Sequence, residues 1–343
     1  MASTRMTRRA FLGRATCCAG LAAVMGGKSG CDQSDEADAQ RLPAAYRYDI
    51  ARLAADDGGL PRCLTVSSVA TGLVGAWAMS SAGSRTLVVG HDERVVVLDV
   101  EGNVVGGWAI EGRGTGLACD GEGGVAVVHG DGVVELYSLE GRRAKRWDLT
   151  DEVTHATAVA LSGDDLFMAD AGAATVSRYH KDDLIWRQRG FHVPGRHFHL
   201  ALGLEGLIWV AHTGRHRLEA YDFSGELREH WGEPGVRIDG FSGCCNPFHF
   251  AIMADGRFVT SEKGLHRVKL SSSDGQAIAM VMDAVGMGVD VNSPQARGSG
   301  RATVSSPLVA TLKGKEMAVL HPLTGTFHVL EAPKEISRDE PTR

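Results

Sequence analysis

The chain has 343 residues and a formal net charge of −6, and 43% of its residues are hydrophobic and 23% charged. This length can bury one large core or two modest ones. The acidic balance provides no positive field for a phosphate backbone, so nucleic acid is excluded as the expected partner. No apolar run of about 20 residues follows the N-terminal region, which predicts a mature chain that does not span a membrane.

Residues 1–39 have the features of an export signal. Thr7-Arg8-Arg9-Ala10-Phe11-Leu12 resembles the twin-arginine motif, and the mildly apolar segment 15–25 that follows is too short to span a bilayer. The resemblance implies export of a folded protein to the periplasm or cell envelope. Two processing routes stay open, cleavage after Ala37-Asp38-Ala39 or lipidation of Cys31, which ends a lipoprotein-like Ser29-Gly30-Cys31. Lipid on Cys31 is the one membrane contact that we expect.

The segments that flank the body of the chain are short. Residues 40–63 are predicted to form a linker with a short helix at 46–56, and residues 333–343 a polar C-terminal tail. After the signal the chain keeps Cys63, Cys119, Cys244 and Cys245, in a compartment where disulfides persist. Four cysteines allow three pairings, which the sequence does not separate.

Six repeats of about 40–50 residues occupy 64–332. Each repeat contains a short apolar strand that ends in a polar residue, at 87–91, 126–129, 167–170, 209–212, 259–262 and 318–321. A second strand follows each of them, at 94–99, 133–138, 175–180, 217–222, 266–271 and 326–331. A turn that usually contains glycine follows the second strand in the first five repeats. Short strands at this spacing are typical of all-β repeat architectures.

Two further strands complete the repeat. One lies upstream and carries a central alanine, at 77–79, 117–119, 159–161, 200–202 and 250–252, and the other places a tryptophan in the first four units, at Trp108, Trp147, Trp186 and Trp231. Four short strands per unit are typical of a propeller blade. The pattern resembles NHL repeats over about residues 66–332, which implies an all-β, six-bladed β-propeller of four-stranded blades. Residues 64–69 are expected to supply the missing outer strand of the sixth blade.

In such a propeller, the loop that leads into the innermost strand of a blade (the leading loop) lies on the same face as the turn between its second and third strands. The residue that ends each second strand therefore forms a ring on that face: His91, His129, Asp170, His212, Glu262 and His321. Imidazole and carboxylate groups suit zinc, iron, copper or manganese. NHL repeats commonly have an aspartate here that shapes the turn. A complete or partial ligand ring and a turn-shaping series both stay open.

The leading loop of the fifth blade contains two adjacent cysteines, Cys244 and Cys245. A disulfide between neighbours closes a small strained ring. We therefore consider a redox-active vicinal pair, or thiolates that bind a soft metal. The alternatives are pairing with Cys63 and simple burial.

Two histidines occupy equivalent positions in neighbouring blades, His199 in the fourth and His249 in the fifth, near the mouth of the central channel. His192, Arg196 and His197 lie close to them in sequence. The equivalence favours a shared ligand, and the alternative is that backbone carbonyls satisfy both imidazoles. The leading loops also lengthen from the fourth blade on, and 284–306 is either a lid or an insertion without order.

These features favour an exported binding propeller that holds a metal ion (zinc, copper or iron) or a small ligand at the channel mouth. An accessory role in a redox or metal-handling system, with a protein partner or small ligand on this face, is part of that interpretation. One alternative is a zinc-dependent lyase, because some NHL-like propellers are zinc lyases with histidine ligands at strand starts. Here Phe198 and Phe248 occupy that position, and a one-residue offset turns a strand side chain to the other face. The other alternative is a protein-interaction scaffold without small-molecule chemistry.

Overall fold

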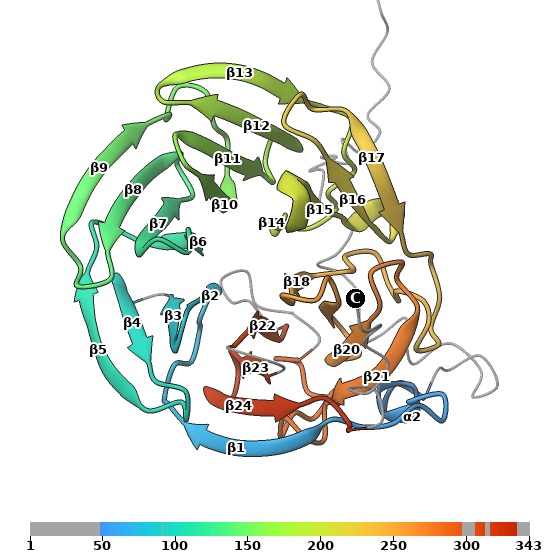
Figure 1. Ribbon diagram of the computed structural model, residues 1–343. Coiled ribbons are helices and arrows are strands. Elements are labelled where there is room, and N and C mark those ends of the chain that lie inside the picture. The colour runs from blue at the N-terminus through green and yellow to red at the C-terminus, as the bar shows by residue number, and fades with distance from the viewer. Residues whose placement is uncertain (1–48, 91, 297–305, 313–315, 335–343) are drawn as a thin grey trace, which may run out of the picture.

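The computed structural model describes residues 49–90, 92–296, 306–312 and 316–334. In this part of the chain, six four-stranded antiparallel sheets stand around a central axis as the blades of a β-propeller (Figure 1). The predicted fold class is therefore confirmed. The predicted second and third strands of each blade agree with the observed ones to within two residues at either end.

The blades follow one another along the chain. Blade 1 contains β2 (Ala78–Ala82), β3 (Arg85–Val89), β4 (Arg94–Leu98) and β5 (Val104–Ala109). Blade 2 contains β6 (Gly114–Cys119), β7 (Gly124–His129), β8 (Val133–Ser138) and β9 (Arg143–Asp148). Blade 3 contains β10 (Ala156–Ser162), β11 (Asp165–Asp170), β12 (Thr175–His180) and β13 (Asp183–Gln188). Blade 4 contains β14 (Leu200–Leu202), β15 (Ile208–His212), β16 (Arg217–Tyr221) and β17 (Leu227–Trp231). Blade 5 contains β18 (His249–Ile252), β19 (Phe258–Glu262), β20 (Arg267–Ser271) and β21 (Ala277–Met282).

Blade 6 closes the ring with strands from both ends of the chain. It contains β22 (Leu308–Thr311), β23 (Glu316–His321) and β24 (Thr326–Glu331), and its outer strand is β1 (Leu64–Ala70). The β1 strand pairs antiparallel with β24, from Leu64 opposite Glu331 to Ala70 opposite Thr326. The predicted closure by residues 64–69 is confirmed. Because a closed ring leaves no unpaired blade, this pairing protects the edge of β24.

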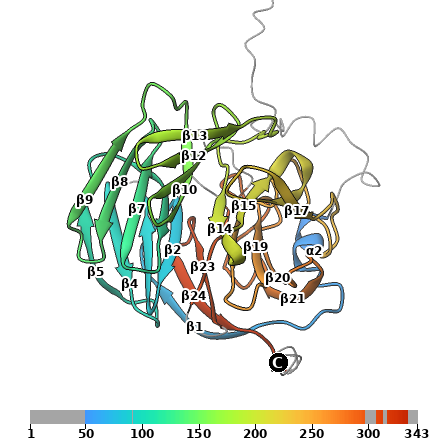
Figure 2. The same ribbon diagram turned by 45° about the horizontal axis from the view of Figure 1, so that its top comes forward.

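A short helix, α2 (Ile50–Ala55), precedes the ring and lies outside blade 5 (Figure 2). Asp49 caps it by accepting a hydrogen bond from the Arg52 amide at 3.0 Å. The helix occupies part of the predicted 46–56, and residues 46–48 lie outside the described part of the chain. Among the described residues, no helix has the length and apolar character needed to cross a membrane.

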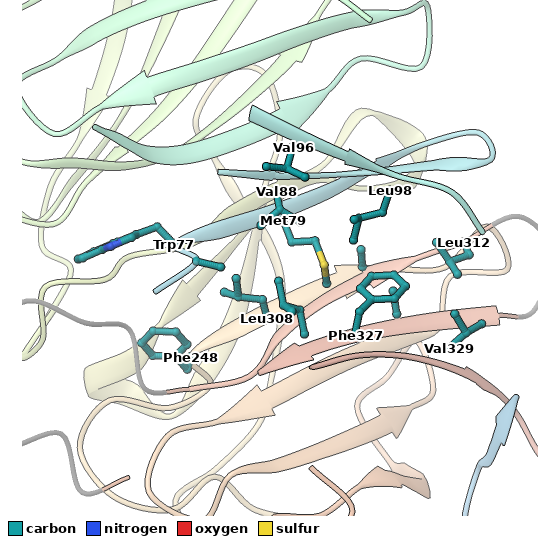
Figure 3. Packing of buried hydrophobic residues seen from close by; sticks show 14 residues of the cluster. Trp77, Met79, Val88, Val96, Leu98, Phe248, Leu308, Leu312, Phe327 and Val329 are labelled. Atoms are coloured by element: carbon teal, nitrogen blue, oxygen red, sulfur yellow. The ribbon is translucent and has the colours of Figure 1, made fainter. Parts of the chain in front are cut away.

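The apolar core is divided into clusters that lie between neighbouring blades. Between blades 1 and 6, Met79 and Leu98 pack with Leu308 and Phe327 (Figure 3). Successive residues of a strand point alternately toward the blade before and the blade after, so a blade is buried on both faces. Burial between blades therefore accounts for the near-continuous apolar runs in the second and third strands.

The repeated tryptophans and turn glycines contact each other across blades. A Cβ on Gly141, in the third turn of blade 2, would lie 2.6 Å from the Trp108 ring of blade 1. A Cβ on Gly275, in the third turn of blade 5, would lie 2.3 Å from Trp231 of blade 4. Trp147 instead donates from Nε1 to the Lys181 carbonyl of blade 3 at 2.8 Å. The recurring tryptophan and the recurring turn glycine therefore belong to one contact, in which the tryptophan of an outer strand packs against the third turn of the next blade.

Hydrogen bonds link the innermost strands around the whole channel. Thr115 Oγ1 donates to the Ala156 carbonyl at 2.8 Å, and Thr157 Oγ1 donates to the Phe198 carbonyl at 2.8 Å. The other four junctions are also bridged, by the pairs His199–Phe250, Thr311–Ile252, Ser81–Thr311 and Ser80–Cys119. These bonds fix the residues that line the channel relative to each other.

Candidate functional site

The ring of predicted ligand positions lies at the ends of the second strands, on the face of the leading loops. His91 lies outside the described residues. The other five are buried at 0 to 4% exposure. Each has polar neighbours within its own blade or the preceding one, so these surroundings decide what the ring residues can bind.

Asp170 shapes the turn at the end of β11. Its Oδ1 accepts hydrogen bonds from the amides of His155, Gly172 and Ala173 at 2.8, 2.8 and 3.0 Å. Its Oδ2 accepts one from the Thr154 amide at 2.8 Å. The carboxylate therefore holds the leading loop of blade 3 against the turn after β11, which is the turn-shaping role described for an aspartate at this position.

His129 and His212 each contact a buried glutamate of the next strand. His129 Nε2 lies 3.2 Å from Glu135 Oε2, and His212 Nδ1 lies 3.0 Å from Glu219 Oε1. His212 Nε2 accepts from the His192 amide at 2.9 Å, which assigns its proton to Nδ1; this nitrogen is close to Glu219 but not aligned for a hydrogen bond. Burial acts to raise the pKa of Glu219, but its neighbours His212, Tyr221 and Arg217 lower it to about 2.

The sequence analysis did not identify these glutamates, although a recurring sequence pattern marks them. Glu135-Leu136-Tyr137 and Glu219-Ala220-Tyr221 occupy the same repeat position, and each tyrosine hydroxyl donates to its glutamate at 2.6 Å. A recurring Glu-x-Tyr in the third strand of a blade marks the partner of the histidine before it.

Glu262 and His321 also lie in buried polar networks. Glu262 receives two hydrogen bonds from Arg267, at 3.0 and 2.8 Å, and Lys269 Nζ lies 3.0 Å away. The Leu323 amide donates to His321 Nδ1, which places the His321 proton on Nε2, 2.9 Å from His266 Nδ1. His266 then donates from Nε2 to the Ala296 carbonyl at 3.0 Å. Burial and the neighbouring His266 lower the pKa of His321 to about 3.

The predicted pair His199 and His249 meets at the channel. Their rings stack with centroids 3.8 Å apart and planes 27° apart. The His197 ring centroid lies 6.0 Å from each of theirs, and His197 stacks on Phe248 at 4.2 Å. The structure thus brings His199 and His249 side by side, and the shared ligand predicted for them stays a prediction.

The nitrogens of this imidazole cluster are only partly satisfied. His199 Nε2 lies 3.1 Å from the Phe250 carbonyl, and His249 Nδ1 accepts from the Val309 amide at 3.5 Å. Both nitrogens of His197 and Nε2 of His249 have no hydrogen-bond partner among the described residues. Burial lowers the pKa of His199 to about 4 and the pKa values of the other two well below 6.5. The three rings are therefore neutral at pH 7 and offer both donors and acceptors.

A cavity of about 340 Å³ fills the central channel and is lined by all six innermost strands. His199 and His249 contribute to its wall where β14 and β18 begin, and Asp120 and Gly121 contribute where β6 has ended. Ser80, Ser81 and Thr311 add further polar groups between the apolar side chains, and the exposed surface of the cavity is more polar than apolar. The cavity has room for a small ligand.

Positive charge gathers at the leading-loop end of the channel. Burial lowers the pKa of His155, and the charges of Arg196 and Arg113 lower it further. The Arg113 guanidinium carbon lies 4.2 Å from the Trp77 ring centroid. Lys263, in the turn after β19, acts on the cluster in the same sense, because its charge helps to depress the pKa of His197.

The adjacent cysteines lie on the same face. Their Sγ atoms are 3.4 Å apart, and Cys244 is exposed whereas Cys245 is 7% exposed. A Cβ on Gly195 would lie 3.4 Å from Cys245 Sγ, so this thiol packs against the leading loop of blade 4. Cys63 packs instead in the core between blades 5 and 6, as a thiol.

No three His, Cys, Asp or Glu side chains of the described residues are grouped so that they could hold a metal ion. His199 and His249 stack face to face, so their in-plane lone pairs do not converge on one point. The arrangement of these two residues does not fit a shared metal ion, and the binding of zinc, copper or iron stays a prediction.

Comparison with known proteins supports the fold. No protein-family model matches the chain, and no curated protein matches it. The chain is similar to the crystal structure of a catalytically inactive histidine-to-alanine variant of virginiamycin B lyase from Staphylococcus aureus, with quinupristin. The TM-score is 0.51 at 10% sequence identity, over 75% of this chain and 80% of the lyase chain. At this identity the likeness shows a shared β-propeller fold alone.

Proposed function

We propose that this chain is a ligand-binding propeller that takes a small anionic molecule at the leading-loop end of its channel. One observation carries the proposal. Arg113, His155 and Arg196 stand at the same repeat position in blades 2, 3 and 4, four residues before the aligned inner-strand residues Leu117, Val159 and Leu200. The equivalent positions give one rim three nitrogen-rich side chains.

The rim lies beside the buried imidazoles. Arg113 and His155 directly precede β6 and β10, and Arg196 directly precedes His197. An anion on the rim would receive charge-assisted hydrogen bonds from the guanidinium groups, which are well suited to carboxylate or phosphate oxygens. The unsatisfied nitrogens of His197 would supply neutral donors next to it.

Three ring carboxylates of this face have hydrogen-bond partners of their own, although the charge of Asp170 still acts on His155. Asp170 is occupied by four backbone amides, Glu219 by Arg217 and Tyr221, and Glu262 by Arg267. Among the described residues, no salt bridge involves Arg196 or Lys263. Local positive potential on an acidic protein raises the local concentration of anions.

Sodium phosphate and sodium benzoate, titrated at constant ionic strength, test the proposal by calorimetry and by the shift in Tm. We expect saturable binding of at least one probe to the wild-type chain. Arg196→Gln should weaken it about tenfold, which corresponds to about 1.4 kcal/mol. Arg215→Gln is the matched control, because Arg215 is also exposed and lies on the same face, in the turn after β15.

Two results would reject an anion site. One is the absence of saturable binding for both probes, which would favour a protein-interaction scaffold. The other is an equal loss in both arginine variants, which would show general attraction to the surface charge and no defined site.

The metal-binding and lyase alternatives make a different prediction. They require stoichiometric zinc, copper or iron in the purified full-length chain, lost in His249→Gln and kept in His328→Gln. His328 is a buried histidine of β24 that contacts Ser68, so it controls for the loss of a buried imidazole. The likeness to a lyase propeller shows the fold and gives no support to the reaction.

We also propose export through the twin-arginine route and an NHL-like origin of the repeats. The signal residues lie outside the described part of the chain, and the support is the motif at 7–12 and the repeat pattern. A double variant that replaces the arginine pair with lysines, Arg8→Lys with Arg9→Lys, should keep the protein inside the cell if the route is used. Unchanged export of this variant would exclude the route.

A further inference from the structure

We propose that Cys244 and Cys245 form a thiol–disulfide exchange site, independent of the anion site. The two Sγ atoms already lie 3.4 Å apart, so a modest movement would bring them to bonding distance. The pair stands in the leading loop of blade 5 on the open face of the propeller, where a partner molecule has access to Cys244.

The two thiols differ in a way that assigns each a role. Cys244 is exposed and can be attacked by, or attack, a disulfide in solution. Cys245 is 7% exposed and packs against Gly195, so it reacts with its neighbour more readily than with an external molecule. Cys244 is therefore the attacking residue and Cys245 the resolving residue.

The surrounding loop is anchored on both sides of the pair. The Ser242 amide and hydroxyl donate to Glu262 Oε2 at 3.1 and 2.9 Å. Asn246 Nδ2 donates to the Lys263 carbonyl at 3.0 Å, and Asn246 Oδ1 accepts from the Lys263 amide at 2.6 Å. Residues 243–245 are the short segment between these anchors, and the carbonyl of Gly243, a residue at φ +67°, is hydrogen-bonded to His216 Nε2. The anchored loop holds the two thiols next to each other.

The other two thiols of the described chain lack these properties. Burial raises the pKa of both Cys63 and Cys119 to about 12. Because the thiolate is the reactive form, both are unreactive near neutral pH. They serve as internal controls in the same molecule.

The oxidant is the disulfide of a small molecule or of a partner protein. The Cys244 thiolate attacks one sulfur of that disulfide, which forms a mixed disulfide and releases the first partner thiolate. The Cys245 thiolate then attacks Cys244 Sγ, which forms the Cys244–Cys245 bond and releases the second partner thiolate. Two electrons pass from the pair to the partner, and the two thiol protons pass to solvent or to the released thiolates. Because a disulfide between neighbours is strained, its reduction is favoured, and the oxidised pair would readily pass the disulfide on.

The full-length chain, equilibrated with mixtures of reduced and oxidised glutathione and then alkylated, tests the proposal by mass spectrometry. We expect the peptide with both cysteines to change between a doubly alkylated form and an internal disulfide that has lost two hydrogens. Cys63 and Cys119 should stay alkylatable after unfolding in every mixture. Cys245→Ser should accumulate glutathione on Cys244, whereas Cys244→Ser should bind little.

Two results would overturn the proposal. One is a stable glutathione adduct on wild-type Cys244 in the amount seen for Cys245→Ser, because that shows no resolution by Cys245. The other is the absence of any oxidised form of the pair across the whole range. The second result is read from the wild-type chain alone, so a variant that fails to fold does not by itself decide the outcome. Phosphate or benzoate binding should be unchanged in Cys244→Ser, which separates this site from the anion site.

Discussion

Removal of the Asp170 carboxylate tests how the polar ring of the propeller works. Asp170→Ala deletes four hydrogen bonds to backbone amides, of 2.8 to 3.0 Å, at a side chain that is 3% exposed. A hydrogen bond to a charged group contributes about 1.5–3 kcal/mol, but the four are not additive, and water can reach part of this loop. We expect the free energy of unfolding to fall by about 3–5 kcal/mol. Asp170→Asn keeps an oxygen for the three amides at Oδ1 and should cost about 1–2 kcal/mol.

Urea denaturation followed by circular dichroism measures these differences as shifts of the midpoint at constant slope. Asp131→Ala is the matched control, because Asp131 occupies a turn in blade 2 and accepts one bond, from the Val133 amide at 3.2 Å. It should cost less than about 1 kcal/mol. A cost for Asp170→Ala no greater than that of Asp131→Ala would refute the view that the ring aspartate organises its loop.

Two further predictions concern buried imidazoles and the turn glycines. Burial lowers the pKa of His199 to about 4 and that of His321 to about 3, so below pH 6.5 the unfolded chain takes up protons that the folded chain does not. The free energy of unfolding should therefore fall with decreasing pH, by about 1.4 kcal/mol per pH unit for each such histidine. Between pH 6.5 and 5, His321→Gln should reduce the dependence of this free energy on pH, measured by urea denaturation, by the equivalent of about one proton. An unchanged pH dependence would contradict this. Gly141→Ala should lower the free energy of unfolding by about 2–4 kcal/mol, because the new Cβ would meet the Trp108 ring at 2.6 Å. Gly83 also has a positive φ, but the space around it is open, so Gly83→Ala should lower the free energy of unfolding by about 1 kcal/mol. Equal losses in these two variants would show that backbone strain alone matters.

The fold was predictable because its signals repeat. An apolar strand that ends in a polar residue, a turn with glycine and a tryptophan each return at blade spacing, and the structure shows that the last two contact each other through Gly141 and Trp108. The closure by β1 was predicted because a ring of blades must close, and the structure shows β1 as the outer strand beside β24. The prediction of a repeated fold survives an ambiguous assignment in one unit, because the other units carry the same pattern.

The site was less predictable because its chemistry depends on distances across the ring. The equivalence of His199 and His249 in adjacent blades was visible, but the 27° stacking of their rings was not. The sequence also shows a histidine such as His212 without showing that Glu219, on the next strand, lies 3.0 Å from one of its nitrogens. A side chain can bind a ligand only with polar atoms that have no hydrogen-bond partner in the folded protein. Which atoms these are depends on neighbours in space, and local sequence patterns do not identify those neighbours.

The two repeat positions on the leading-loop face use their polar side chains differently. At the ends of the second strands, the carboxylates and histidines of the ring contact backbone amides, a glutamate or a cation of a neighbouring strand or loop. These contacts hold strands and loops together. At the starts of the inner strands, by contrast, the chain presents Arg113, His155 and Arg196, and burial together with the charges of the two arginines lowers the pKa of the histidine. Arg196 takes part in none of the salt bridges that tie up the nearby acids of the described chain, so its guanidinium keeps capacity for an anion. Function on this propeller is therefore to be sought at the starts of the inner strands, around His197, and less at the ends of the second strands.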